Sequence, residues 1–70
     1  MVATPQAART SDALVRALGA PDESVRARAA WSLGLAEDAR AGAALVRALD
    51  DASADVRDQA VWALGVRRER

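Results

Sequence analysis

Apolar residues recur along this chain with the spacing of a helix rather than that of a strand. In residues 25–34 (VRARAAWSLG) and 56–65 (VRDQAVWALG), apolar side chains return every three or four positions, so they fall on one helical face. The pattern predicts that this face forms the core. Its members are Val25, Ala29, Ser32 and Leu33 in the first segment and Val56, Ala60, Ala63 and Leu64 in the second.

These two segments belong to a longer internal repeat with a period of 31 residues. Residues 8–34 align with residues 39–65 without a gap, and 14 of the 27 pairs are identical. A fixed period of this length is typical of stacked repeats, in which each unit leaves an apolar face for its neighbour to cover. The sequence therefore predicts a single domain, 1–70, with repeat one at about 5–34, repeat two at about 36–65 and a tail at 66–70.

Capping and turn residues divide each repeat into two helices. The expected N-terminal caps are Thr4, Asp22, either Glu37 or Asp38, and Ser53. The expected helix ends are about Leu18, Gly34, the turn at 50–52 and Gly65. In each repeat the first helix offers a facing surface, made of Leu14, Val15 and Leu18 in repeat one and of Leu45, Val46 and Leu49 in repeat two. The pattern predicts an all-α fold of four antiparallel helices in two hairpins.

The repeat unit resembles the HEAT-like repeats of the PBS-lyase type. The resemblance is carried by an L-V-R-A-L helix, an acidic or Pro-containing turn, and the motif V-R-x-x-A-x-W-x-L-G, over residues 5–66. It implies a short α-solenoid whose second helices line a concave face. It also implies that Arg26 and Arg57, which follow the Val of the motif, pair with an acidic residue in an adjoining turn. The linker at 35–40 departs from the family pattern, because it lacks the usual Gly-Asp-Pro turn.

Composition limits how large a core this chain can bury. Of its apolar residues 19 are Ala, and there is no Cys or His to supply a disulfide or a zinc site, so the core is expected to be thin and closely packed. Ten Arg balance ten Asp and Glu, and this neutral charge argues against a nonspecific binder of nucleic acid. No apolar run is long enough to cross a bilayer, so we expect a cytoplasmic protein with no membrane partner.

Trp31 and Trp62 are the residues that most strongly suggest a binding site. Each lies roughly 150° around its helix from the centre of the core stripe, so the two indoles should face outward, side by side on the concave surface. The flanking polar residues Arg28, Asp58 and Gln59 complete the candidate partner-binding set. Aromatic and Arg side chains are common anchors in binding grooves. The alternative interpretation is that each indole only shields the seam between repeats.

Catalytic and metal-binding chemistry find no support in the sequence. The chain has no His, Cys, Lys or Tyr, so a Ser nucleophile would have no base. Asp51, Ser53 and Asp55 imitate the start of a calcium loop, but Val56 and Trp62 stand where that loop needs Gly and Glu. We therefore expect no enzyme activity, no cofactor and no metal.

The leading hypothesis is a noncatalytic module that presents its concave surface to a protein or peptide. The alternatives are a nucleic-acid-binding module and an accessory subunit or fragment of a larger lyase-like enzyme. Arrays of this kind generally need about three repeats. We therefore expect an end face to be covered by a second copy, giving a homo-oligomer, by a partner, or by the rest of a longer chain. The apolar residues that we expect on these end faces are Ala41, Ala43, Ala44, Val61 and Val66.

Overall fold

Four helices form the whole regular structure of the described chain, which in this computed structural model comprises the backbone of residues 5–68 and the side chains of residues 10–68. The helices are α1 (Pro5–Ala17), α2 (Glu23–Leu35), α3 (Ala39–Ala48) and α4 (Ala54–Arg68). The described chain contains no strand. The prediction of an all-α fold with four helices is confirmed.

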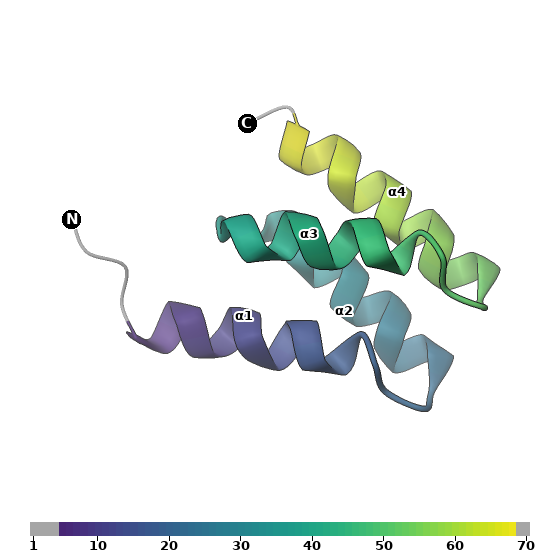
Figure 1. Ribbon diagram of the computed structural model, residues 1–70, viewed down its shortest axis with the longest axis horizontal. Helices are drawn as coiled ribbons and strands as arrows, with labels where there is room; N and C mark the ends of the chain where they lie inside the picture. The colour runs from purple at the N-terminus through teal and green to yellow at the C-terminus, as the bar shows by residue number, and fades with distance from the viewer. Residues whose placement is uncertain (1–4, 69–70) are drawn as a thin grey trace.

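The helices are arranged as two hairpins stacked one on the other (Figure 1). α1 and α2 form the first hairpin, and α3 and α4 form the second. The most extensive contact joins the two second helices, α2 and α4, while α1 lies beside α3. Residues that are 31 positions apart in the sequence therefore occupy corresponding places in neighbouring hairpins.

Short polar side chains start three of the helices as expected. The backbone N–H of Ser24 donates to Asp22 Oδ1 at 2.8 Å, and that of Arg40 donates to Asp38 Oδ1 at 2.9 Å. Ser53 Oγ accepts from the backbone N–H of Val56 at 3.4 Å. Each cap satisfies an N–H that has no partner within its helix. The expected cap of the first helix, Thr4, lies outside the described residues.

Two predicted helix ends are wrong, because the glycines do not stop the helices. α2 continues through Gly34 to Leu35, and α4 continues through Gly65 to Arg68, so residues 66–68 extend the helix. Glycine ends a helix most readily in the left-handed conformation, and no residue of the described chain has a positive φ. Here the glycines remain helical, and α4 packs closely against Gly34.

Arg67, in the last turn of α4, connects that helix to the α2–α3 linker. Its guanidinium donates to the carbonyls of Leu33 at 3.3 Å, Asp38 at 2.8 Å and Ala36. These carbonyls belong to the end of α2, to the segment after it and to the N-cap of α3. Arg67 therefore holds the α2–α3 linker in place, although the sequence of this linker contains no recognisable turn motif.

The core is thin and rich in alanine, as the composition predicts. Its buried cluster consists of Ala30, Leu33, Ala41, Ala44, Leu45, Ala48, Val56, Ala60 and Ala63. Leu33, Leu45 and Val56 are its largest fully buried side chains. Small residues at the remaining contacts let the helix axes approach closely, which compensates for the small number of large apolar side chains.

Several residues depart from the predicted core. Val25, Val46 and Leu49 are exposed, and Ser32 and Leu64 are only partly buried. Conversely Ala41 and Ala44, which we expected on an end face, are fully enclosed between the hairpins. Helical periodicity shows which side of a helix is apolar, but only the neighbouring helices decide which part of that side is covered.

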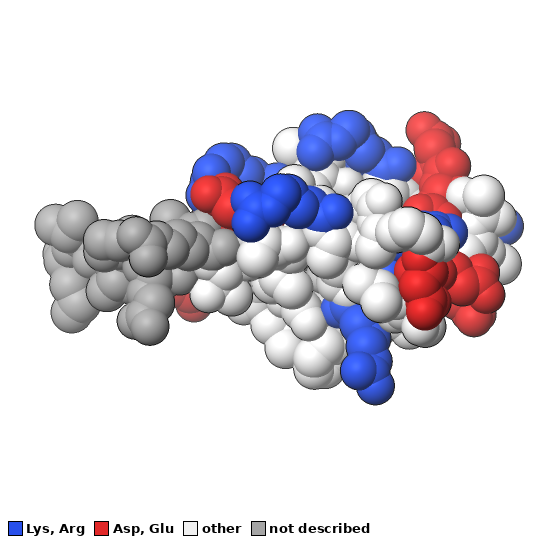
Figure 2. Space-filling model, turned by 90° about the horizontal axis from the view of Figure 1, so that it is seen from below, with Lys and Arg blue, Asp and Glu red and all other residues white. Residues whose placement is uncertain are grey.

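Charged side chains are distributed unevenly over the surface. Figure 2 shows most of the acidic side chains in view gathered at the end of the molecule that carries the α1–α2 and α3–α4 turns. Asp22 and Asp51 of these turns accept hydrogen bonds from backbone N–H groups. The net charge of zero thus includes a local excess of acidic side chains at the turn end.

Candidate functional site

The two tryptophans stack on one another on the surface formed by α2 and α4. The ring centroids of Trp31 and Trp62 are 5.9 Å apart, and the ring planes differ by 4°. Trp31 is 47% exposed and Trp62 is 44% exposed. The prediction that these indoles stand side by side and face outward is confirmed, because the repeat places them at the same position of adjacent helices.

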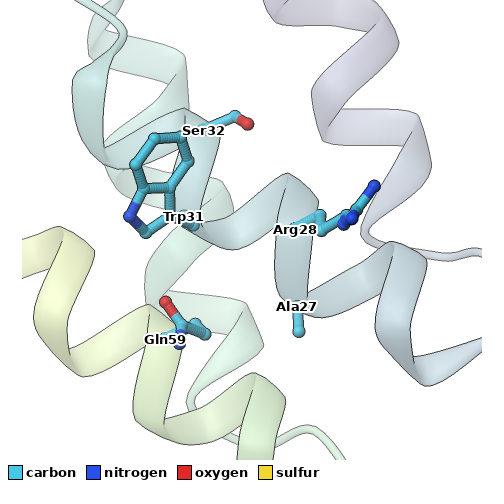
Figure 3. A pocket seen from close by; sticks show the side chains of 5 residues that line it. All are labelled: Ala27, Arg28, Trp31, Ser32 and Gln59. Atoms are coloured by element: carbon cyan, nitrogen blue, oxygen red, sulfur yellow. The ribbon is translucent and has the colours of Figure 1, made fainter.

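A hollow of about 490 Å³ opens beside the stacked pair. It is lined by Ala27, Arg28, Trp31, Ser32 and Gln59. Figure 3 shows that these side chains come from two helices, with Gln59 reaching in from α4 and Arg28 extending from α2 toward α1. We call these five residues together with Trp62 the tryptophan groove.

The groove contains most, but not all, of the predicted partner-binding residues. Trp31, Arg28 and Gln59 line it, and Trp62 stacks on the ring of Trp31. Asp58 is exposed and does not line the hollow. Ser32, which periodicity assigns to the core, lines the groove instead. The structure thus assembles this surface, and its role in binding stays a prediction.

Arg28 is the positively charged group of the groove. Its side chain is exposed and forms no ion pair with the carboxylates of residues 10–68. A guanidinium next to an indole surface can bind a carboxylate or a carbonyl, while the aromatic face covers an apolar group. The groove therefore offers one hydrogen-bonding cation beside a broad apolar wall.

Arg26 has a structural role, as the family resemblance implies. Its Nε and Nη2 atoms donate to the two carboxylate oxygens of Asp51 at 3.0 Å and 3.2 Å, and Nη1 donates to the carbonyls of Ala20 and Pro21. The side chain therefore joins the turn of its own hairpin to the turn of the next one. The backbone N–H of Ser53 and then the Arg26 guanidinium lower the pKa of Asp51 below its ordinary value.

The same expectation fails for Arg57. Its Nη1 donates to the backbone carbonyls of Asp51 and Ala52 at 2.8 Å and 3.1 Å, and it forms no ion pair with a carboxylate of residues 10–68. The reason is positional, because the carboxylate that Arg26 uses belongs to the following hairpin. No described hairpin follows α4.

The lowered carboxylate pKa values predict a loss of stability in acid. Hydrogen bonds from Arg40 lower the pKa of Asp38 from 3.8 to about 2. The pKa values of Asp22 and Asp51 are also lowered. A group whose pKa is lowered by folding stabilises the fold only while it is ionised. We therefore expect the thermal midpoint to be constant from about pH 8 to about pH 5 and to fall between about pH 4 and pH 2.

Circular dichroism melts at a series of pH values measure this dependence. The variant Asp38→Asn keeps an acceptor for the cap but removes the titrating group, so its melting temperature should fall less steeply in acid than that of the unmodified chain. Equal slopes for the two chains would contradict the assignment to Asp38.

No metal-binding cluster appears in the part of the chain that the structure describes. No group of three or more Asp or Glu side chains there could hold a metal ion. In the same residues, no helix is both long and apolar enough to span a membrane. The groove offers indole faces, a guanidinium, an amide and a hydroxyl to a ligand.

Comparison with protein families agrees with the stacked hairpins. The family model for HEAT repeats matches residues 2–68. The chain belongs to the HEAT-repeat family. HEAT repeats generally mediate protein–protein interactions and typically form noncatalytic scaffolds. Neither a curated protein nor a solved structure matches this HEAT-repeat chain.

Four arginines of this HEAT-repeat chain are engaged within the protein itself. Hydrogen bonds to backbone carbonyls or carboxylates hold the side chains of Arg26, Arg40, Arg57 and Arg67. Nucleic-acid binding needs several arginines free to contact phosphates on one face. These four side chains are therefore not free to contact phosphates.

Proposed function

We propose that this chain is a noncatalytic protein-interaction module that binds a peptide segment of a partner protein in the tryptophan groove. The observation that supports this most directly is the stacked pair of half-exposed indoles beside a hollow of about 490 Å³. An exposed aromatic surface of this size next to a concavity is typical of recognition sites.

The binding mechanism relies on a surface that is already formed before the partner arrives. Stacking on Trp62 limits the orientations open to Trp31, so little side-chain entropy remains to be lost on binding. An apolar side chain of the partner would lie against the indole wall and displace water from it. Arg28 and Gln59 would bond to polar groups that flank that side chain.

The groove suits a segment that combines an apolar residue with a carboxylate or a series of backbone carbonyls. Arg28 can donate hydrogen bonds to either group, because its guanidinium is not engaged by a carboxylate of residues 10–68. A cytoplasmic location and the absence of catalysis are part of this proposal, and they rest on composition and on the family's typical scaffold role.

Replacement of both tryptophans should abolish peptide binding while the fold is retained. Peptides selected from a random displayed library on the unmodified chain are the probes, and binding is measured by calorimetry. For Trp31→Ala we expect affinity to fall at least about tenfold, because truncation of a central aromatic anchor commonly costs 2 kcal/mol or more, about the size of a hot spot. The double variant with Trp62→Ala should show no measurable binding.

The matched control for these variants is Val46→Ala. Val46 is a large apolar residue of α3 that is 56% exposed and does not line the groove. Its replacement should leave affinity for the selected peptides unchanged. If the tryptophan double variant bound them as well as the control does, the groove would not be the binding site. Circular dichroism verifies that all three chains keep the same helicity.

A further inference from the structure

The helix face that joins the two hairpins occurs a second time, at the end of the molecule. On α2 this face consists of Arg26, Ala30, Leu33 and Gly34, and α4 repeats it as Arg57, Val61, Leu64 and Gly65. We call the second set the C-terminal end face. Ala30 and Leu33 are fully buried, whereas Val61 is 60% exposed and Leu64 is partly exposed. The α2 face is therefore covered by the second hairpin, whereas nothing in the described chain covers the C-terminal end face of α4.

The glycines of the two faces show the same difference most clearly. A Cβ atom built on Gly34 would lie 2.8 Å from Ala63 Cβ and 2.9 Å from Ala63 Cα. Gly34 is thus the point at which α4 approaches α2 closely enough to exclude any side chain. A Cβ atom on Gly65 would meet nothing within 4 Å. The C-terminal end face keeps the small residue of a helix contact without the contacting helix.

The arginines of the two faces begin with the same contacts and then diverge. Arg26 and Arg57 both donate from Nη1 to two carbonyls of the turn in their own hairpin. Arg26 additionally pairs with Asp51 of the following hairpin. Arg57 is held in the corresponding pose, and the carboxylate that would complete its contacts is missing from residues 10–68.

From this correspondence we propose that the C-terminal end face is a docking site for a helical hairpin of a partner protein. That hairpin has a carboxylate in its interhelical turn, to pair with Arg57, and a small residue such as Ala on its second helix, to pack against Gly65. This site is separate from the tryptophan groove, and it extends an interface that the chain already uses between its own hairpins.

A second copy of this chain fits the site less well than such a partner. In a head-to-tail stack, the first hairpin of the copy would present Ala20 at the position of Asp51 and Ser32 at the position of Ala63. Ala20 gives Arg57 no carboxylate. Ser32 adds a hydroxyl to the side chain that faces the glycine, at a contact where the methyl group of Ala63 already leaves no space for a Cβ atom on Gly34. The sequence of the first hairpin thus disfavours self-stacking.

Titration of the isotope-labelled full chain with an unlabelled full-length variant tests the proposal by nuclear magnetic resonance. The probe carries Ala20→Asp and Ser32→Ala, so that its first hairpin presents the carboxylate and the small residue that Asp51 and Ala63 provide in the second, together with Gly65→Leu so that the probe cannot stack further. We expect the probe to shift the amide resonances of α4 in the labelled chain. A probe with Ala20→Asn in place of Ala20→Asp should bind roughly tenfold more weakly, because it loses the charge but keeps the turn acceptor.

The receptor variant Gly65→Leu is expected to retain its helicity and lose binding of the probe. Equal binding to this variant and to the unmodified chain would overturn the proposal, as would no binding of the probe up to about 1 mM, roughly the limit of weak association. Self-association of the chain without probe, seen by light scattering and removed by Gly65→Leu, would instead assign the face to a second copy and would also overturn it.

Discussion

Gly34→Leu should push the two hairpins apart and lower the free energy of unfolding by about 3 kcal/mol or more, the upper part of the range for overpacked cores. A Cβ atom at this position already lies 2.8 Å from the side chain and 2.9 Å from the backbone of Ala63. These atoms are a helix backbone and the Cβ atom fixed to it, so they cannot rotate away as a long flexible side chain would. α4 must shift as a whole, and with it the most extensive helix contact of the molecule.

Gly65→Leu is the matched control, because Gly65 occupies the same position in the second hairpin. Nothing lies within 4 Å of a Cβ atom there, so the new side chain has space. Leucine also favours a helix over glycine by roughly 0.5–1 kcal/mol, and the control should be slightly more stable than the unmodified chain. Urea unfolding followed by circular dichroism gives both values. Similar losses in the two variants would mean that the close approach at Gly34 is not what limits substitution.

Features that depend on local sequence could be predicted from the sequence. Asp22, Asp38 and Ser53 are found at helix starts because a cap needs only a short polar side chain and the next turn of backbone. The pairing of Trp31 with Trp62 follows from the repeat period, since equal positions in stacked hairpins are neighbours. Both predictions needed no knowledge of the surroundings beyond the repeat itself.

Features that depend on which neighbour is present could not be predicted in the same way. Val25 and Val56 have the same place in their repeats, yet Val25 is 42% exposed and Val56 is fully buried. Arg26 and Arg57 likewise share a motif but differ in their carboxylate contacts. Periodicity assigns one environment to both members of each pair, whereas stacking covers opposite faces of the two hairpins.

In the candidate site, too, features of a single helix could be predicted, whereas contacts between helices could not. The exposure of the indoles and the presence of Arg28 and Gln59 nearby could be predicted from helical geometry. The inclusion of Ser32 depends on how α2 lies against α4, and the bridge from Arg67 to the linker joins residues that are about one repeat apart. No local pattern signals either contact, because both require the final arrangement of the helices.

Leu45→Ala is expected to unfold much of the population, and its effect tests whether the stacked hairpins stabilise each other. Leu45 is fully buried in the alanine-rich core, and removal of such a side chain typically costs about 2–5 kcal/mol. A chain of this length has a total stability of roughly 3–10 kcal/mol, at about 0.05–0.15 kcal/mol per residue. The variant should therefore lose a large fraction of its helical signal at physiological temperature, as seen by circular dichroism.

Leu14→Ala provides the comparison, because Leu14 is the corresponding residue of the first hairpin. It is only partly buried and packs against the edge of the core cluster. Less apolar surface returns to water when it is truncated, so we expect a loss smaller than that of Leu45→Ala. The same residue type in the same helix position would then differ in effect only because a hairpin lies on one side of Leu45 and not of Leu14. Equal losses would mean that each hairpin is stable without the other. Burial of the C-terminal end face at Gly65 by a further hairpin would then be expected to add little binding free energy.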